Sequence, residues 1–437
     1  MPEPARSAAQ EPPLEVAPTT PMLRQYAEAK AQAKDALLFF RLGDFYELFY
    51  DDARLAAQAL GITLTARSKG EDRVPMCGVP YHAAKGYIGK LVALGHKVAI
   101  CDQLEAPGPG KQLVRREIVR LVTPGTLVDD EALEAREAMV LAAVAPGPAG
   151  EGTKPAVGIS FLDASTGELR ALPALPWDAA LDELARARPR EVLVPEELLG
   201  TPRAEELRKA SGTLRLEGRA FRDARAAASL LQRHLGVATL DGFGFAGEPL
   251  SALAAAEALS YLQETQRSAA QHVVRLSISQ PAQALWIDPS AVRNLELFRG
   301  PDGRRTGTLL ALLDRTHTAA GGRLLSRWLS APLVDLAQIS ARQDAVEELA
   351  SASVLREDLA APLRCVLDVE RLLGRLAVGQ GAPRDLAGLR SSLQQLPQLS
   401  ARLSACRSAR LAGLAPPLRT LDGLADLLSR ALADEVP

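Results

Sequence analysis

Gly108 to Lys111 is a segment whose residue types could bind phosphate, because glycine-rich loops ending in lysine hold nucleotide phosphates on backbone N–H groups. The full pattern needs a glycine five residues before its second glycine and a Ser or Thr after the lysine. Glu105 and Gln112 occupy those positions, and Pro109 removes one backbone donor. We therefore do not expect this segment to bind ATP by that route, and no other segment of the sequence carries the pattern.

Asp163 follows a predicted strand, Val157 to Leu162, and precedes a turn. This arrangement resembles the opening strand of RNase H-like folds, some of which place metal-binding carboxylates there. Two-metal nuclease chemistry needs several convergent carboxylates, and Asp163 has no obvious partners in the sequence. A nuclease stays open as an alternative, and it predicts divalent-metal-dependent DNA cleavage that Asp163→Ala abolishes.

Phe45 and Glu47 place an aromatic ring and a carboxylate two residues apart, just after a predicted strand. From the pattern alone Phe45 is a core residue and Glu47 a solvated charge, because Phe45, Leu48 and Phe49 have the spacing of one helix face. The other interpretation puts Leu48 and Phe49 in the core, while Phe45 lies at the strand–helix junction and points outward.

Composition limits the class of protein. The 437 residues are too many for one ordinary core and predict two to four domains. Lys plus Arg number 51 against 53 acidic residues, so a strongly basic coat is excluded and any positive surface must be local. The four cysteines are scattered and indicate neither a zinc site nor a disulfide framework. With no membrane-length apolar run and no signal peptide, we expect a soluble cytoplasmic protein without a membrane partner.

The order of elements predicts a multidomain α/β plus α protein. Residues 1–19 are proline-rich and should form a disordered tail. Thr20 and Pro21 suit the start of a helix, and the apolar run Ala36 to Leu42 has strand length. Predicted strands on both sides of the turn-rich segment 146–152 indicate a hairpin. From about Pro249 onward the periodicity is mostly helical.

The stretch Arg41 to Phe49 resembles the mismatch-recognition motif of the MutS family of DNA mismatch repair proteins, whose core is Phe-x-Glu. Val74 to Ala83 and Val119 to Thr126 resemble the next two blocks of that family. Later blocks that resemble the family's lever domain are Asp288 to Leu297, Leu312 to Thr316, Gly322 to Leu325, Trp328-Leu329, Ile339 to Glu347 and Asp368 to Arg371. The resemblance therefore runs in order from about residue 20 to the end.

This resemblance implies three regions: a mixed α/β mismatch-binding domain (20–130), an RNase H-like connector domain (131–248), and the first part of an α-helical core or lever domain (249–437). It implies duplex DNA with mismatches or small loops as a partner, with MutL and a second MutS subunit for complete family members. ATP and Mg²⁺ are likewise implied only for complete family members, since the family's clamp and ATPase domains are not recognised in this span. We expect this span to need no cofactor or metal, to have no catalytic residue, and to act near the nucleoid.

The resemblance also implies roles for Phe45 and Glu47. Mismatched steps pair and stack weakly, so the duplex kinks there cheaply, and an aromatic wedge entering from the minor groove exploits this. Glu47 would hydrogen-bond the displaced base, while its repulsion from phosphates penalises paired duplex.

Four further residues are expected to support DNA binding. Leu42 would brace the wedge, and Arg67, Lys69 and Arg73 flank a loop that could contact phosphates. Residues 21–128 carry 15 Lys plus Arg against 11 Asp plus Glu, opposite in sign to the whole chain. Ordinary solvated loop charges remain an equal interpretation of the three cations. A chain that only scaffolds partners through its connector is a last alternative, which predicts no DNA binding even at low salt.

Overall fold

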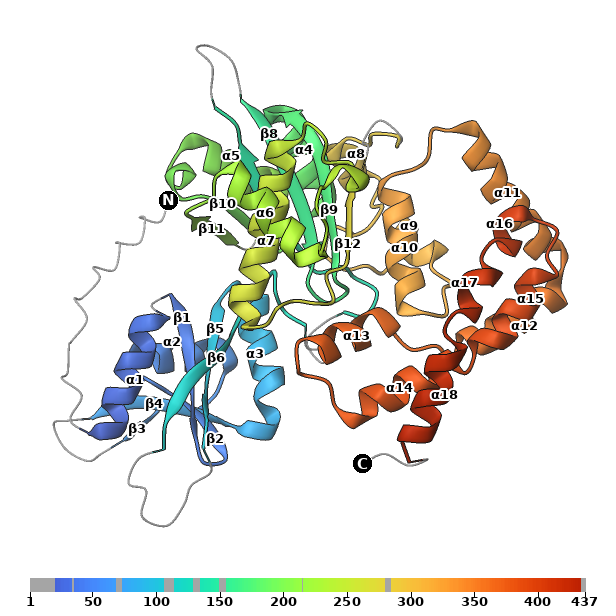
Figure 1. Ribbon diagram of the computed structural model, residues 1–437. Helices are drawn as coiled ribbons and strands as arrows, with labels where there is room; N and C mark the ends of the chain where they lie inside the picture. Colours follow the sequence, from blue (N-terminus) through green and yellow to red (C-terminus); the bar gives the residue numbers. More distant parts are fainter. Residues whose placement is uncertain are drawn as a thin grey trace, which may run out of the picture. The chain divides into compact units, whose positions relative to one another are not determined.

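The computed structural model describes residues 20–33, 35–67, 73–105, 114–128, 134–148, 155–213, 215–279 and 284–433. The predicted tail at 1–19, Lys69 and the predicted boundary at 130/131 lie outside these ranges. The chain divides into two compact units, residues 1–81 with 98–119 and residues 82–97 with 120–437. Figure 1 shows the elements of each.

A six-stranded sheet organises the first part of the chain, with the strand order β3-β4-β2-β1-β5-β6. The helix α1 begins where the sequence predicts, because the Thr20 hydroxyl accepts a hydrogen bond from the Leu23 N–H at 3.3 Å and Pro21 fills the first helical position. The elements are α1 (Pro21–Gln32), β1 (Ala36–Leu42), β2 (Phe45–Phe49), α2 (Tyr50–Leu60), β3 (Thr65–Arg67), β4 (Val74–Pro80), α3 (Ala84–Ala93), β5 (Lys97–Gln103) and β6 (Arg116–Val122).

The segment after Gly43-Asp44 is a strand, so the prediction that Phe45 lies at a strand–helix junction is wrong. β1 and β2 form an antiparallel hairpin in which Leu42 faces Phe45 across a two-residue turn. Gly43 has φ +58°, in the left-handed region that glycine adopts without strain. Helix α2 begins only at Tyr50. The segment from Phe45 to Phe49 has only five residues. Over so short a length, the spacing of Phe45, Leu48 and Phe49 fits one face of a helix as well as a strand whose inner end is buried.

Asp52, near the start of α2, ties the hairpin to its neighbours. Its Oδ2 accepts hydrogen bonds from the Tyr26 hydroxyl and the Leu38 N–H, both at 3.0 Å, and its Oδ1 pairs with Lys30 at 2.8 Å. Tyr26 also packs edge-on against Phe49, with ring centroids 5.0 Å apart. Helix α1, strand β1 and helix α2 are thereby joined beneath the inner end of β2.

The second sheet has the order β11-β10-β7-β8-β9-β12. β8 runs antiparallel to both β7 and β9, while β10 and β11 continue parallel to β7, the arrangement expected of an RNase H-like sheet. The β7–β8 pair confirms the predicted hairpin. Its elements are β7 (Val140–Pro146), β8 (Ala156–Asp163), β9 (Glu168–Pro176), α4 (Trp177–Ala187), β10 (Glu191–Pro195), α5 (Pro202–Ser211), β11 (Arg215–Arg219), α6 (Ala224–Leu235), α7 (Pro249–Gln266) and β12 (Arg275–Ile278).

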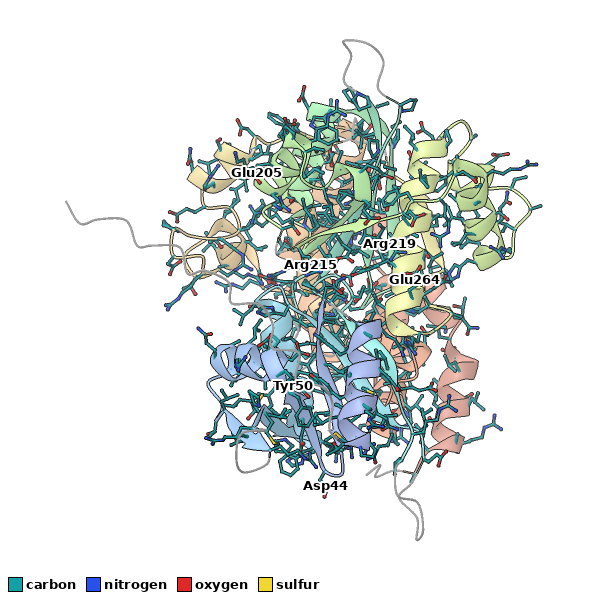
Figure 2. The ribbon with its side chains drawn as sticks, turned by 90° about the vertical axis from the view of Figure 1, so that its left-hand side faces the viewer. Asp44, Tyr50, Glu205, Arg215, Arg219 and Glu264 are labelled. Carbon is teal, nitrogen blue, oxygen red and sulfur yellow. The ribbon has the colours of Figure 1, made fainter. Side chains whose placement is uncertain are left out.

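Helices cover both faces of this sheet. Alternate residues of the strands pack against α6 and α7 on one side, and the residues between them pack against α4 and α5 on the other (Figure 1). Most residues of α7 are buried, on all sides of the helix, as for a helix inside a core. Arg219 on β11 clasps the α7 carboxylate of Glu264 through contacts of 2.8 and 2.9 Å, and the two side chains point toward each other in Figure 2. The helix expected to open the third region therefore packs with the second sheet.

The remainder is helical, and Asp and Thr side chains cap several of its helices. None of the helices in the described ranges has the length and apolar composition that crossing a membrane requires. These helices are α8 (Pro289–Asn294), α9 (Leu309–Leu313), α10 (Ala319–Ser330), α11 (Leu336–Ser351), α12 (Ser353–Leu363), α13 (Val369–Ala377), α14 (Pro383–Leu393), α15 (Leu396–Ser404), α16 (Ala409–Ala412), α17 (Ala415–Arg419) and α18 (Asp422–Ala431).

Gly158 on β8 provides a test of the packing of α7. A Cβ atom there would lie 2.2 Å from the Leu250 carbonyl carbon and oxygen and 2.6 Å from the Ser251 nitrogen. Because backbone atoms cannot rotate away, Gly158→Ala should lower the free energy of unfolding by about 2 kcal/mol or more. Calorimetry of thermal unfolding measures the change.

Gly86→Ala is the matched control, since no atom lies within 4 Å of its added methyl group and the residue is inside helix α3. It should leave stability unchanged or raise it by about 0.5–1 kcal/mol. Equal unfolding temperatures for the two variants would contradict the close approach of α7 to β8.

Candidate nucleic-acid interface

The turn Gly43-Asp44 carries Phe45 at the first position of β2, an interior strand of the first sheet. Figure 2 shows Asp44 at the tip of this hairpin, with its side chain directed away from the sheet. The Phe45 side chain follows the turn and is 47% exposed, whereas Leu48 and Phe49 are fully buried, as expected from the sequence. Since β2 is a strand, Phe45 and Glu47 share one face, and Tyr46 and Leu48 belong to the other.

Gly78 of β4 lies directly opposite Glu47 in the β2–β4 pair. A Cβ atom on Gly78 would lie 3.5 Å from the Glu47 Cγ and 4.0 Å from the Phe45 Cδ1. The ring and the carboxylate therefore border one spot on the sheet, which the missing side chain of Gly78 leaves open. The sequence analysis did not single out Gly78, although an isolated glycine in a strand marks a place where another group can approach closely.

Arg67 of β3 reaches the same face and pairs with Glu47, with 2.9 Å between Nη1 and Oε2. The Glu47 side chain is only 19% exposed, against 47% for Arg67. Burial raises the pKa of the Glu47 carboxyl above its ordinary value, and the charge and hydrogen bond of Arg67 partly oppose this rise. Glu47 is thus a carboxylate that takes up a proton more readily than a solvated one.

Arg41 of β1 holds the turn from the opposite face. Its guanidinium lies 3.4 Å from the centroid of the Tyr81 ring and 5.5 Å from that of Tyr46, and its Nε donates to the Gly43 carbonyl. The Tyr81 N–H donates a hydrogen bond to the Asp44 carbonyl at 2.8 Å. Both carbonyls of the turn are therefore engaged, and the backbone before Phe45 is fixed. Sequence reasoning missed Arg41, because its partner Tyr81 is forty positions away.

Asp102 of β5 completes this support. Its Oδ2 accepts a hydrogen bond from the Tyr46 hydroxyl at 3.1 Å, and its Oδ1 lies 3.9 Å from the Arg41 guanidinium. Burial and the nearby charge of Asp102 raise the pKa of Tyr46. Tyr46 therefore stays neutral and its hydroxyl donates a hydrogen bond to Asp102, which links β2 to β5 on the far side of β1.

Comparisons with known proteins identify the family. The family models for MutS domain I, MutS domain II and MutS domain III match residues 20–131, 139–274 and 290–437. The chain belongs to the MutS family. The DNA mismatch repair proteins MutS of Anaeromyxobacter sp. (strain Fw109-5), Myxococcus xanthus (strain DK1622) and Symbiobacterium thermophilum are 53%, 49% and 46% identical to it, each over 97% of this chain. The chain covers 47%, 47% and 49% of these relatives, so it spans about half of their length.

The other residues predicted from the MutS resemblance lie in domain I. Leu42 is half-buried and faces Phe45 across the turn, a position from which it could support the ring. Arg73 is exposed just before β4 and, within the described residues, makes no contact with Phe45 or Glu47. Lys69 lies outside the described residues. The structure therefore brings Arg67 to the Phe-x-Glu motif but not Arg73.

Asp163 in MutS domain II has a structural role. Its Oδ1 accepts hydrogen bonds from the N–H and the hydroxyl of Ser165, at 3.0 and 2.6 Å, and its Oδ2 accepts one from the Met139 N–H at 3.2 Å. The carboxylate is buried and holds the turn between β8 and β9. The described ranges contain no cluster of three His, Cys, Asp or Glu side chains suited to a metal ion. Asp163 gives the nuclease alternative no support.

The contact between Glu47 and Arg67 predicts a change in titration. Arg67→Gln removes the positive charge that stabilises the ionised carboxylate, so the pKa of Glu47 should rise further. NMR titration of the protein with ¹³C-labelled glutamate side chains measures it. Arg54→Gln is the control, because Arg54 pairs with Asp51 on the exposed side of α2 and should leave Glu47 unaffected. An unchanged or lower pKa in Arg67→Gln would show that the pair does not form in solution.

Proposed function

We propose that this MutS family chain recognises mismatched or unpaired bases in duplex DNA, and that Phe45 is the wedge that enters at the minor groove. The observation that carries the proposal is an aromatic side chain half exposed at the start of an interior strand, next to a turn whose two carbonyls are both engaged. A wedge must transmit force to the DNA without yielding, and a clamped two-residue turn suits that purpose.

The physical basis of discrimination is the stacking energy of the step that is opened. A paired step resists an inserted ring, whereas a mismatched step gives up little pairing and stacking and bends readily. Stacking of a base on an aromatic ring stabilises the complex by about 1–3 kcal/mol and does not depend on which base is present. One ring can therefore serve many kinds of mismatch.

Glu47 would act on the same base step from its place beside Phe45. In the free protein Arg67 neutralises it. Because Arg67 is nearly half exposed, we infer that it turns to a phosphate when DNA is present, which leaves the Glu47 carboxyl for the displaced base. A raised pKa makes the protonated form, which donates as well as accepts a hydrogen bond, easier to reach than for a solvated carboxyl. Leu42 would support the ring, and Lys69 and Arg73 would add phosphate contacts.

The complete activity extends beyond this span. The relatives that are about twice as long carry the name DNA mismatch repair protein MutS. For a protein of that length we propose use of ATP with Mg²⁺, pairing with a second subunit and recruitment of MutL, all in the cytoplasm at the nucleoid. The contribution of domains I to III would be to read the DNA and pass the result on.

Phe45→Ala tests the wedge. The variant should lose the preference for mismatched over paired duplex, a loss of about 5- to 150-fold from the stacking energy alone. Fluorescence anisotropy with two oligonucleotide duplexes that differ at one base measures it at low salt. Trp286→Ala, which removes a comparably exposed ring in the second unit, should keep the preference.

If Phe45→Ala retains the preference, the wedge assignment is wrong. If the unaltered chain binds neither duplex at low salt, where phosphate contacts are strongest, the scaffold alternative is favoured instead.

Glu47→Gln separates the role of the carboxylate from that of the ring. Removing the negative charge frees Arg67 and abolishes repulsion from phosphates, so affinity for the fully paired duplex should rise by several fold while discrimination falls. The same anisotropy assay reports both quantities. Glu117→Gln is the control, because that carboxylate of β6 also pairs with an arginine, Arg115. Equal effects of the two substitutions would mean that Glu47 acts only through its negative charge and has no specific role in discrimination.

A further inference from the structure

An arginine-rich cleft lies within the second unit, with a volume of about 1360 Å³. Eleven arginines and one lysine line it, against six acidic residues, although the whole chain has a net charge of -2. Most of its lining residues belong to segments 134–212 and 275–330, in and beside the spans that match domains II and III. Residues from 89–93 and 124–127, in the span that matches domain I, also line it. The excess of positive charge is therefore local and lines a concave surface.

Two of these arginines share a single carboxylate, and a third lies close enough to feel their charges. Glu137 lies 2.6 Å from Arg299 and 3.4 Å from Arg190, one contact for each of its oxygens. Arg188 lies 5.2 Å from the centroid of the Phe298 ring and, among the described residues, forms no ion pair. Burial and then the charge of Arg299 lower the pKa of Arg188. Three guanidinium groups with one carboxylate leave a local surplus of two positive charges.

A fourth arginine of the cleft forms no direct ion pair within the described residues, and the carboxylates of Glu168 and Glu183 act on it only through their charge. Arg170 lies 4.8 Å from the centroid of the Phe161 ring, and no side chain in the described ranges offers it a hydrogen bond or an ion pair. Arg327 and Arg186, the neighbouring cations, are already paired with Glu168 and Glu183. Burial lowers the pKa of Arg170. Removing such a charge from water is unfavourable unless an anion compensates for it.

We propose that this cleft binds a phosphate-bearing anion, held between Arg188, Arg190 and Arg299. The planar arginine fork matches phosphate oxygens through paired hydrogen bonds, and a group with two negative charges balances the local surplus. The ligand would be a small compound with linked phosphates or the phosphates of a DNA backbone, which share this chemistry. The proposal is independent of the Phe45 wedge, which belongs to the other unit.

The first test uses inorganic pyrophosphate and the intact chain. Isothermal titration calorimetry at low salt should detect binding that sodium chloride of equal ionic strength does not reproduce. Arg188→Gln and Arg299→Gln should each weaken it at least tenfold. Glu137→Gln should strengthen it several fold, because the competing carboxylate is removed and two arginines are released. Arg364→Gln, an exposed arginine paired with Glu357 and not among the residues lining the cleft, should have no effect.

The opposite direction expected for Glu137→Gln keeps the test decisive, since a poorly folded variant would not bind more tightly. Melting temperatures check the folding of each variant. Titration with paired duplex DNA distinguishes the two sources of phosphate. If Arg188→Gln weakens duplex binding and pyrophosphate competes with it, the cleft takes backbone phosphates, and if duplex binding is unchanged, it takes a small compound.

Pyrophosphate affinities that are equal in all variants would overturn the proposal. So would the absence of pyrophosphate binding together with duplex affinities that Arg188→Gln leaves unchanged.

Discussion

The two-residue turn at Gly43-Asp44 is the constraint on which the candidate interface depends. A turn of that length fixes the register, so that Leu42 faces Phe45 and Phe40 faces Glu47. The alternation of a strand then gives Phe45 and Glu47 one face and sends Tyr46 and Leu48 to the other. An extra residue in the turn would exchange these faces and bury the carboxylate instead. The five residues Phe45–Phe49 thus supply both buried core side chains and the exposed ring beside the turn.

The contacts beneath this turn hold the hairpin firmly, as the wedge proposed for Phe45 would require. Arg41 and Tyr81 engage the turn carbonyls from one side, and the Asp52 carboxylate anchors the inner end of the hairpin through Tyr26. Each contact is modest by itself, since a hydrogen bond contributes about 0.5–1.5 kcal/mol in net terms. Together they are comparable with the stacking energy that a wedge must supply, so the hairpin need not deform before the DNA does.

The sequence predicted elements that depend on local signals and missed contacts that depend on topology. The start of α1 follows from the Thr20 cap, and the β7–β8 hairpin follows from its turn-rich loop. Phe45 was misplaced because five residues are too few to separate the two periodicities. Arg67 can pair with Glu47 because the sheet places β3 only one strand away from β2, with β4 between them. No spacing in the chain reveals that order, so the resemblance could name the motif but not its partner.

The charged residues at the hairpin are paired with one another, so they add little to the affinity for DNA whatever they add to specificity. Glu47 is matched by Arg67, and Arg41 lies close to Asp102, so these residues give the tip little net attraction for DNA. Affinity for duplex DNA comes mainly from neutralised phosphates, which report nothing about pairing. A tip that contributed strongly to affinity would hold paired and mismatched DNA alike. In the proposed mode of recognition, a nearly neutral tip would let the cost of opening a base step decide the outcome, while the attraction would be supplied elsewhere.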